Sequence, residues 1–216
     1  MAGREGRKSS KNRPTTNPAP PCTLKLLMIG NIHTGKSSLV RNYCSKDSET
    51  DYNTSEIETH SIGLLDCMDK TLDINGQEVT LEIWDTAGTE TYDSITANYY
   101  RGADGVCLTY SIIDNKSFDL LNVWMSRVHE NTRLHTPVML LGTKSDLEEG
   151  REVEKHRAQS YANEQEDIRY FFEVSIKNKD TIDQAMFEFS KFLIRNHSHE
   201  DQTSQVKTNT NQGCCH

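Results

Sequence analysis

Gly30-Asn31-Ile32-His33-Thr34-Gly35-Lys36-Ser37 has the spacing G-x-x-x-x-G-K-[ST]. The apolar run Leu24–Ile29 comes directly before it, so a buried strand would lead into the loop. A strand, a glycine-bounded loop and then a helix form a cradle for phosphate groups. The alternative is an ordinary glycine-containing turn between a strand and a helix.

The chemistry of a phosphate cradle explains the residue types at this spacing. Gly30 and Gly35 permit backbone conformations that side chains forbid, so successive N–H groups can converge on one phosphate. A helix that begins near Lys36 would add the positive end of its dipole. The Lys36 ammonium would lie between the β- and γ-phosphates, and the Ser37 hydroxyl would bind Mg²⁺.

Three further polar segments each follow a strand-like run. They are Trp84-Asp85-Thr86-Ala87-Gly88 after Val79–Ile83, Thr143-Lys144-Ser145-Asp146 after Pro137–Gly142, and Glu173-Val174-Ser175-Ile176-Lys177 after Arg169–Phe172. Nucleotides bind at the carboxyl ends of parallel strands, so we expect these segments and the loop to converge on one site. Asp85 would hold Mg²⁺ through a water, and the Gly88 N–H would contact a γ-phosphate.

With these motifs the chain resembles the Ras superfamily of small GTPases, and within it the Rab family. The resemblance covers about residues 22–195, and Trp84–Gly88, Asn98–Ala103 and the paired Cys214-Cys215 favour Rab over other branches. It implies a single P-loop G domain. Alternating strands and helices predict the α/β class, and we expect a mostly parallel six-stranded sheet with helices on both faces.

The resemblance also implies a role for each motif residue toward GTP or GDP. Asp146 would accept the N1 and N2 protons of guanine, and adenine would leave this carboxylate unpaired. Lys144 would lie along the base, with the backbone of Ser175-Ile176 facing guanine O6. The nucleotide-binding set is Gly30, His33, Thr34, Gly35, Lys36, Ser37, Ser38, Ser61, Asp85, Gly88, Thr143, Lys144, Asp146, Ser175, Ile176 and Lys177. The implied Mg²⁺ ligands are Ser37, Ser61 and, through a water, Asp85. The implied catalytic residues are Lys36, Gly88 and, as a weak substitute for the usual glutamine, Thr89.

Three residues depart from the family pattern where hydrolysis takes place. Thr89 replaces the glutamine that orients the attacking water. Ile32 is β-branched and would crowd the space of an incoming arginine finger, and His33 would be strained if its φ angle is positive. We therefore expect slow intrinsic hydrolysis, or alternatively a hydrolysis-deficient module that stays loaded with GTP. Activating proteins of the Rab type insert both an arginine and a glutamine, so Thr89 need not block assisted hydrolysis.

The polar stretch Asp47–His60 is expected to be a surface loop that corresponds to switch I. Ser61 is our candidate for its Mg²⁺ ligand, with Thr59 as the alternative. The stretch Leu64–Cys67 lacks the aromatic side chain that is usual in Rab proteins. It is also one residue longer than the corresponding stretch of the family. Trp84 would then either contact effectors or simply belong to the core.

The remaining elements follow from local patterns. Asn75-Gly76 predicts a tight hairpin between two strands, and Asp104–Tyr110 predicts a strand buried on both faces. A helix is expected from about Lys36 to Lys46. Apolar stripes at helical spacing predict two further core-facing helices, at Phe118, Leu121, Met125 and Val128, and at Ile182, Ala185, Met186, Phe189 and Leu193.

Charge and length set limits on the class of protein. The 216 residues suit one domain with two tails, and the net charge is −8. Residues 1–21 hold five basic residues against one acidic residue, or +4, so the rest of the chain carries −12. Such a body lacks the basic face that nucleic acid requires, and we expect no nucleic-acid partner. The N-terminal segment 1–21 is predicted to be a disordered basic arm, more a solvated tail than a lipid-binding element.

Targeting signals of other classes are not found in the sequence. A mean hydropathy of −0.71 and the lack of a long apolar run argue against a transmembrane helix, and no apolar signal-peptide core is present. Ala2 excludes N-myristoylation, which needs glycine at that position. Cys22, Cys44, Cys67 and Cys107 are scattered, which predicts reduced thiols. A zinc site would have to draw on His197, His199, Cys214, Cys215 and His216, whose spacing matches no common zinc pattern.

Residues 196–216 are expected to be a flexible tail that ends in the lipidation sites Cys214 and Cys215. Gly213 excludes a CaaX box, and the ending resembles the doubly geranylgeranylated ends of Rab proteins. Unmodified thiols are the alternative. The resemblance implies a monomer on the cytoplasmic face of intracellular membranes with a soluble cytosolic pool. Its partners would be effectors, an exchange factor, an activating protein and the prenylation escort machinery, in vesicle-mediated protein transport. A scaffold that needs no nucleotide is a third hypothesis, which the intact phosphate and guanine motifs disfavour.

Overall fold

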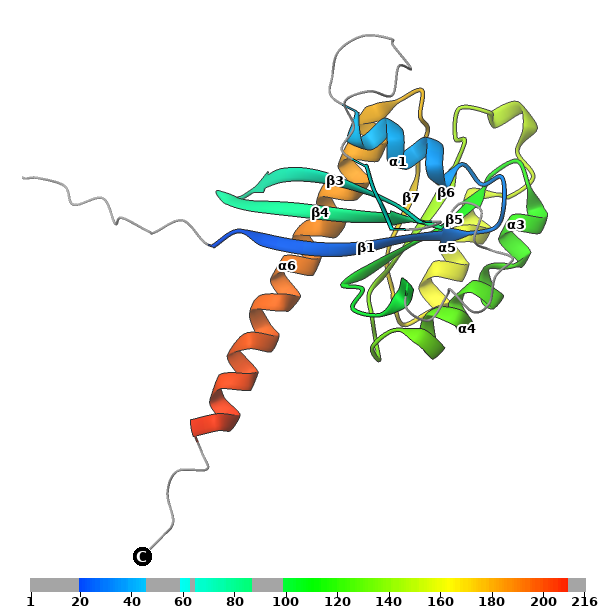
Figure 1. The fold of residues 1–216 in the computed structure, drawn as a ribbon. Helices are drawn as coiled ribbons and strands as arrows, with labels where there is room; N and C mark the ends of the chain where they lie inside the picture. The colour runs from blue at the N-terminus through cyan, green and yellow to red at the C-terminus, as the bar shows by residue number, and fades with distance from the viewer. Residues whose placement is uncertain (1–19, 46–58, 63–64, 87–98, 210–216) are drawn as a thin grey trace, which may run out of the picture.

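A seven-stranded sheet in the order β2-β3-β4-β1-β5-β6-β7 forms the centre of the molecule (Figure 1). The computed structural model of the chain describes residues 20–45, 59–62, 65–86 and 99–209. Its elements are β1 (Cys22–Gly30), α1 (Lys36–Cys44), β2 (Thr59–Ile62), β3 (Leu65–Ile74), β4 (Gln77–Asp85), β5 (Gly105–Ser111), α3 (Asn115–Asp119), α4 (Leu121–Asn131), β6 (Val138–Thr143), the 3-10 helix η1 (Glu148–Gly150), α5 (Lys155–Glu164), β7 (Ile168–Glu173) and α6 (Lys179–Asn209). The predicted α/β class and the mostly parallel sheet are confirmed.

The sheet has one strand more than the six that we predicted. The additional strand, β2, pairs antiparallel with β3 from Thr59↔Met68 to Ile62↔Leu65. The sequence gives β2 no alternating apolar pattern, and its first residues were assigned to the polar loop Asp47–His60. The backbone hydrogen bonds between β2 and β3 can form whatever side chains the strands carry. A pattern of side chains therefore does not reveal this pairing.

The strands that lead to the phosphate motif are the most deeply buried part of the sheet. In β1, Leu24 and residues 26–29 have no solvent exposure, and β1 lies between β4 and β5 in parallel register. Every residue of β5 and of β6 is buried. Burial on both faces is what a parallel strand covered by helices requires, and it confirms the expectation for Asp104–Tyr110.

Two apolar clusters, one on each face of the sheet, join the helices to the strands. On one face α1 and α6 pack on the sheet, and the predicted stripe from Ile182 to Leu193 is buried there. On the other face α3, α4 and α5 pack on the sheet and bury the stripe from Phe118 to Val128. The expectation that both stripes face the core is confirmed, and the helices lie on both faces (Figure 1).

The turn between β3 and β4 has the conformation that its sequence predicts. Asn75 and Gly76 have φ angles of 57° and 83°. Positive φ at both central residues is the geometry of the two-residue hairpin turn whose twist matches that of the strands. The Asp73 side chain accepts a hydrogen bond from the Gly76 N–H at 3.0 Å, which stabilises the turn further.

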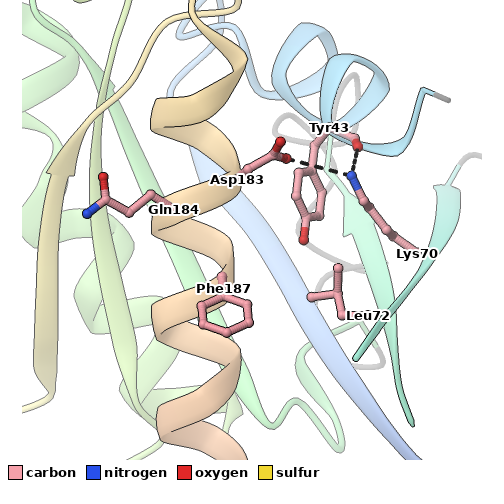
Figure 2. Close-up of a pocket in the computed structure, with 6 residues that line it drawn as sticks. All are labelled: Tyr43, Lys70, Leu72, Asp183, Gln184 and Phe187. Carbon is pink, nitrogen blue, oxygen red and sulfur yellow. Dashed lines mark hydrogen bonds and ion pairs between the residues drawn. The ribbon is translucent and has the colours of Figure 1, made fainter. Parts of the chain in front are cut away.

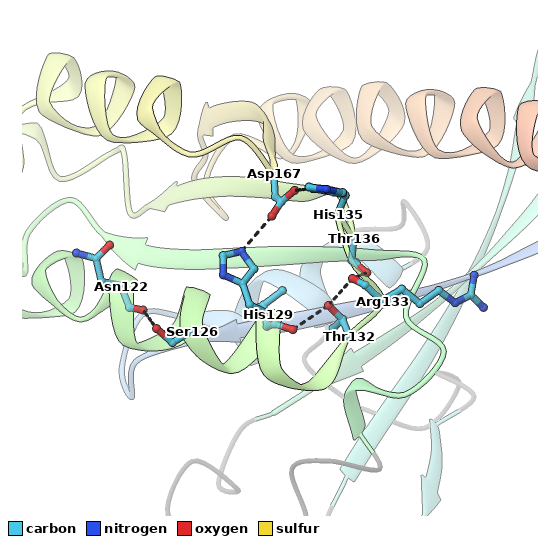
Figure 3. A network of polar contacts seen from close by, with 9 residues as sticks. Asn122, Ser126, His129, Thr132, Arg133, His135, Thr136 and Asp167 are labelled. Carbon is cyan, nitrogen blue, oxygen red and sulfur yellow. Dashed lines mark hydrogen bonds and ion pairs between the residues drawn. The ribbon is translucent and has the colours of Figure 1, made fainter.

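The connection from α4 to β6 is anchored by a buried carboxylate that no sequence pattern indicated (Figure 3). Asp167, 8% exposed, lies between two imidazole rings, with Oδ2 3.0 Å from His129 Nε2 and Oδ1 3.1 Å from His135 Nδ1. Thr132 and Thr136 donate hydrogen bonds to the backbone carbonyls of Val128 and Arg133. These contacts fix the end of α4 beside the start of β7.

The last helix continues past the predicted boundary of the domain at residue 195. α6 extends from Lys179 to Asn209, within the segment that we expected to be a flexible tail. The side chains beyond Asn196 are not described, so the division into an arm, a domain and a tail stays a prediction. Among the residues that the structure describes, no helix is long and apolar enough to cross a bilayer.

The four thiols of the described domain are free. Burial raises the pKa of the Cys107 thiol to about 12 and that of Cys44 to about 11, so both stay protonated and unreactive. Within the described part of the chain no group of histidine, cysteine and carboxylate side chains could hold a metal ion. The residues of the alternative zinc site lie outside the described side chains.

Leucine truncation at two matched positions tests where the core lies. Leu140 in β6 has no exposure, whereas Leu134 in the α4–β6 connection is 87% exposed. We expect Leu140→Ala to lower the free energy of unfolding by about 2–5 kcal/mol, and Leu134→Ala to change it by less than about 0.5 kcal/mol. Urea unfolding of the two variants measures both values. Equal losses would contradict the assigned core.

Candidate functional site

The four motif segments lie at one edge of the sheet. β1, β4, β5, β6 and β7 are mutually parallel, so their carboxyl ends, from Gly30 to Glu173, share one side of the molecule. The residues that follow these ends are the glycine-bounded loop, Asp85-Thr86, Thr143–Asp146 and Ser175–Lys177. The structure therefore brings together segments that are up to about 140 residues apart in the sequence, at the place where α/β sheets bind ligands.

Gly30 begins the loop at a position where no side chain fits. Its φ angle is +142°, and a Cβ atom there would lie 2.3 Å from the backbone oxygen of Thr109 in β5. The loop can therefore leave β1 only along the surface of its neighbour. His33 has a φ angle of 64°, so the positive φ considered in the sequence analysis is present. Histidine is one of the residues that tolerates this left-handed conformation better than most.

The end of the loop and the start of α1 turn their polar groups toward one point. Gly35, with φ at 90°, precedes the helix, and no side chain caps the first turn. The free N–H groups of a helix N-terminus form an anion-binding site. Lys36 is 4% exposed, and its ammonium donates to the backbone oxygens of Gly30 and Asn31, both at 2.9 Å. The lysine thus folds back over the loop.

Three threonine hydroxyls, here called the threonine brace, fasten the loop to β5 and β6. The Thr143 hydroxyl lies 2.5 Å from the Thr34 carbonyl oxygen and 2.9 Å from that of Tyr110, so its single proton is shared between, or donated to one of, these two acceptors. The hydroxyls of Thr34 and Thr109 are 2.9 Å apart, and Thr109 also donates to the Ile29 carbonyl. All three side chains are buried. The loop is therefore held by hydrogen bonds that are shielded from water.

Lys144 makes a second link between the two halves of the site. Its ammonium donates to the His33 carbonyl oxygen at 2.8 Å, and its own φ angle is 61°. The side chain that the family resemblance places along a base is thus tied to the loop that the resemblance places around the phosphates. The two halves cannot move independently without breaking this bond.

Asp146 is held by the segment that follows β7. Its Oδ1 accepts a hydrogen bond from the Ser175 hydroxyl at 2.5 Å, and its Oδ2 lies 2.9 Å from the Lys177 ammonium. These contacts, with the Ser175 hydrogen bond as the largest cause, hold the pKa of Asp146 below its ordinary value. The carboxylate is therefore ionised at neutral and mildly acidic pH, which is the form that accepts N–H donors.

Oxygen groups that suit Mg²⁺ lie beside the cradle. Ser37 is in the first turn of α1, and Asp85, 5% exposed, ends β4 opposite Met28 of β1. A hydroxyl and a carboxylate are the hard oxygen ligands that Mg²⁺ prefers, so the chemistry of these two residues fits the metal. Ser61 lies in β2 opposite Asp66, and its side chain is outside the described part of the structure.

Several predicted residues are not tested by the structure. Gly88, Thr89, Cys214 and Cys215 lie outside the described residues. Ser38 is described and exposed in the first turn of α1, and Ile32 is 56% exposed on the loop. Exposure alone does not test whether Ile32 crowds the space of an arginine finger, so this stays a prediction.

Sequence reasoning missed three members of the site. Thr109 and the carbonyl of Tyr110 belong to the threonine brace, and a threonine near the end of an otherwise apolar buried strand was the available signal. Asn42 of α1 donates to the Ile176 carbonyl at 3.3 Å, which joins the helix after the cradle to the segment after β7. Nothing in the local sequence around Asn42 indicated this contact.

Trp84 belongs in part to the core, and its contact with effectors stays a prediction. It packs against the cluster of α3, α4 and α5 and is only partly buried. Its ring meets Tyr99 edge to face with centroids 6.2 Å apart, and the Lys25 ammonium lies 4.9 Å from its centre. The Tyr99 hydroxyl donates to the Trp84 carbonyl. The residue therefore supports the core and leaves part of its ring accessible.

Comparisons with known proteins give one consistent family. The Ras family model matches residues 25–195. The chain is 39% identical over 170 residues to the Ras-related protein Rab-13 of Bos taurus, with 79% of each chain covered. It is 37% identical over 199 residues to Rab-13 of Mesocricetus auratus, covering 87% of this chain and 94% of the relative. Against human Rab-8B it is 36% identical over 173 residues, covering 79% and 78%.

The role of the Thr143 hydroxyl in holding the loop can be tested with two variants, one without the hydroxyl and one that keeps it. Thr143→Val keeps the shape but leaves the Thr34 and Tyr110 carbonyls without this donor, whereas Thr143→Ser keeps the hydroxyl. We expect the valine variant to lose about 1–3 kcal/mol of unfolding free energy and to release labelled GDP about five to ten times faster. The serine variant should stay close to the parent. Valine and serine variants that behave alike in urea unfolding and in GDP release would contradict this role.

Proposed function

The chain belongs to the Ras family of small GTPases and is of the Rab type, and on this basis we propose that it is a GTP/GDP-binding switch that recruits effectors in vesicle traffic. The observation that carries the proposal is the direct connection between the two halves of the site. Thr143 and Lys144 contact the backbone of Thr34 and His33, so a ligand with phosphates and a base would be held by one rigid frame.

Specificity for guanine is assigned to Asp146. Its two oxygens would accept the N1 and N2 protons of guanine, and adenine offers no such pair of donors. Ser175 and Lys177 keep the carboxylate ionised and oriented before the base arrives. The backbone of Ser175-Ile176 would face O6, and the Lys144 stem would lie along the ring.

Phosphate binding and Mg²⁺ binding are assigned to the cradle. Backbone N–H groups from residue 30 to residue 38 and the Lys36 ammonium would surround the phosphates, and Ser37, Ser61 and, through a water, Asp85 would hold Mg²⁺. The metal neutralises phosphate charge when it is bound. Lys36 would act with it by stabilising charge as the terminal phosphate leaves. The Gly88 N–H would contact the γ-phosphate, so that its presence or loss switches the loop between two states.

The proposal also includes slow intrinsic hydrolysis of GTP. Thr89 lacks the amide with which glutamine holds the attacking water, and Ile32 exposes a branched side chain within the phosphate loop. Family members already turn over at a rate on the order of 10⁻⁴ per second without help. The second candidate function is a module that hydrolyses no GTP in practice and remains loaded. Thr89 and Ile32 also favour this permanently loaded module.

Membrane attachment is assigned to Cys214 and Cys215, each with one geranylgeranyl group. A single lipid chain gives marginal binding, and the tail from residue 196 has only Lys207 against Glu200 and Asp201, so no basic patch could replace the second lipid. The protein would act as a monomer on the cytoplasmic face of intracellular membranes, with a cytosolic pool. Effectors, an exchange factor, an activating protein and prenylation escort proteins of the Rab type would be its partners.

Bound nucleotide is the direct test of this function. Native mass spectrometry of the purified protein should find guanine nucleotide with Mg²⁺, and labelled GTP should bind saturably and be displaced by GDP but not by ATP. A protein that is empty and takes up no GTP would refute the switch and favour a scaffold without nucleotide.

Hydrolysis at Thr89 can be tested in single-turnover assays. We expect Thr89→Gln to raise the intrinsic rate of phosphate release by about tenfold or more, because the amide can hold the attacking water. Thr89→Val should release phosphate within about threefold of the parent rate, since the threonine hydroxyl is expected to be only a weak substitute for the glutamine amide. Phosphate release by the parent protein with an activating domain of the Rab type would exclude the permanently loaded module. A valine variant much slower than the parent would show that Thr89 itself takes part.

Lipidation can be tested by imaging tagged protein in cells. We expect the parent on intracellular membranes, and the double variant Cys214→Ser/Cys215→Ser to be diffuse in the cytosol. Each single variant keeps one lipid at most and should bind membranes reversibly and weakly. Membrane localisation that persists in the double variant would contradict the assignment.

A further inference from the structure

The guanidinium of Arg151 lies between two carboxylates, and each of its N–H groups has an acceptor. Nη1 and Nη2 donate to the two carboxylate oxygens of Glu173 at 2.8 and 2.9 Å, and Nε and Nη2 donate to those of Glu148 at 2.8 and 2.7 Å. Nη1 also donates to the Val153 carbonyl oxygen at 2.9 Å. Paired hydrogen bonds on both sides fix the plane of the guanidinium as well as its position.

The two carboxylates come from the two segments that form the guanine side of the site. Glu148 begins η1 and follows Asp146 by two residues, and Glu173 ends β7 and precedes Ser175 by two residues. The Ser175 hydroxyl donates to Asp146 Oδ1 at 2.5 Å. The contacts of these residues therefore close into a ring, in which Arg151 lies opposite the hydrogen bond between Asp146 and Ser175.

The two sides of Arg151 differ in their exposure to solvent. The Arg151 and Glu173 side chains are 10% and 9% exposed, whereas that of Glu148 is 67% exposed. Packing also confines Glu173, because a Cβ atom at Gly142 of β6 would lie 3.1 Å from its Cγ and 2.6 Å from the Tyr110 hydroxyl. A buried charge pair is screened much less than an exposed one, so the Glu173 side is the firm end of the link.

Backbone pairing leaves the orientation of the guanine-side groups to other contacts. The Ser145 N–H donates to the Val174 carbonyl oxygen at 3.2 Å, which joins the same two segments. Ser145 and Val174 each come one residue before Asp146 and Ser175 in the chain. The segments that continue past this bond are the ones that Arg151 holds together.

We propose that Arg151 is a positioning residue for guanine recognition, which keeps the Asp146 carboxylate aligned with the Ser175–Lys177 segment so that both of its oxygens meet the base. The inference deepens the proposed function and rests on it. Arg151 acts through Glu148 and Glu173 and not on the nucleotide itself. A lysine could not replace it, because an ammonium lacks the planar geometry that pairs with both oxygens of a carboxylate. The alternative role is a brace that stabilises the fold without affecting recognition of the base.

A nucleotide with one donor fewer separates positioning from stability. Inosine diphosphate has the N1–H of guanine and lacks its N2 amine, so it needs only one oxygen of Asp146. Arg151→Lys keeps the positive charge and loses the paired hydrogen bonds. We expect this variant to release labelled GDP about ten times faster than the parent, and labelled inosine diphosphate at most about threefold faster. A brace without a role in recognition would change the two release rates by the same factor.

Two further variants complete the test. Arg157→Lys is the matched control at a surface ion pair, in which Arg157 of α5 lies 2.8 Å from Asp119 of α3, and it should change neither rate. Glu148→Gln alters the exposed side of Arg151 and should accelerate GDP release about twofold more than release of inosine diphosphate. This variant decides the matter if Arg151→Lys does not fold.

The outcomes distinguish this inference from the function on which it rests. Equal changes for both nucleotides in Arg151→Lys and in Glu148→Gln, or the same preference for GDP release in Arg157→Lys, would overturn the inference without affecting the proposed function. A parent protein that takes up neither nucleotide would refute the proposed function and the inference together.

Discussion

The threonine brace is the contact on which the site depends. A loop with positive φ angles at Gly30, His33 and Gly35 has no regular backbone pairing of its own, so other groups must hold it. The Thr143 hydroxyl of β6 reaches the Thr34 carbonyl oxygen, and the Thr109 hydroxyl of β5 pairs with the Thr34 hydroxyl. Because these hydrogen bonds are buried, breaking one would leave a desolvated carbonyl. The loop is thereby kept in an otherwise unfavourable shape.

The brace also explains why the chain can depart from its relatives without losing the frame. Ile32 and His33 expose their side chains, and the contacts of the loop run through backbone atoms and through Thr34. Changes at Ile32 and His33 therefore alter what an approaching protein meets and leave the attachment of the loop intact. In the proposed function, nucleotide binding would depend on the backbone of the loop and on Thr34, and turnover on the exposed side chains of the same segment.

α1 contacts both halves of the site. Its first turn carries Lys36 and Ser37, and Asn42 donates to the Ile176 carbonyl at 3.3 Å. At the other end of the helix the Tyr43 carbonyl accepts a hydrogen bond from Lys70 of β3 at 2.6 Å (Figure 2). The cradle and the segment after β7 are therefore attached to one helix, which is itself tied to the antiparallel part of the sheet.

Local patterns in the sequence were enough to determine the α/β class, the central strands, the hairpin at Asn75-Gly76, the two core-facing helical stripes and the four segments of the site. Each of these features depends on residues that are close together along the chain. They form either an apolar periodicity or a motif of fixed spacing. Only the tertiary structure decided that β2 joins the sheet, that Asp167 joins two histidines, and that Thr109 and Asn42 belong to the site. These features arise from contacts between distant segments, and a hydrogen bond between such segments leaves no periodic trace in either of them.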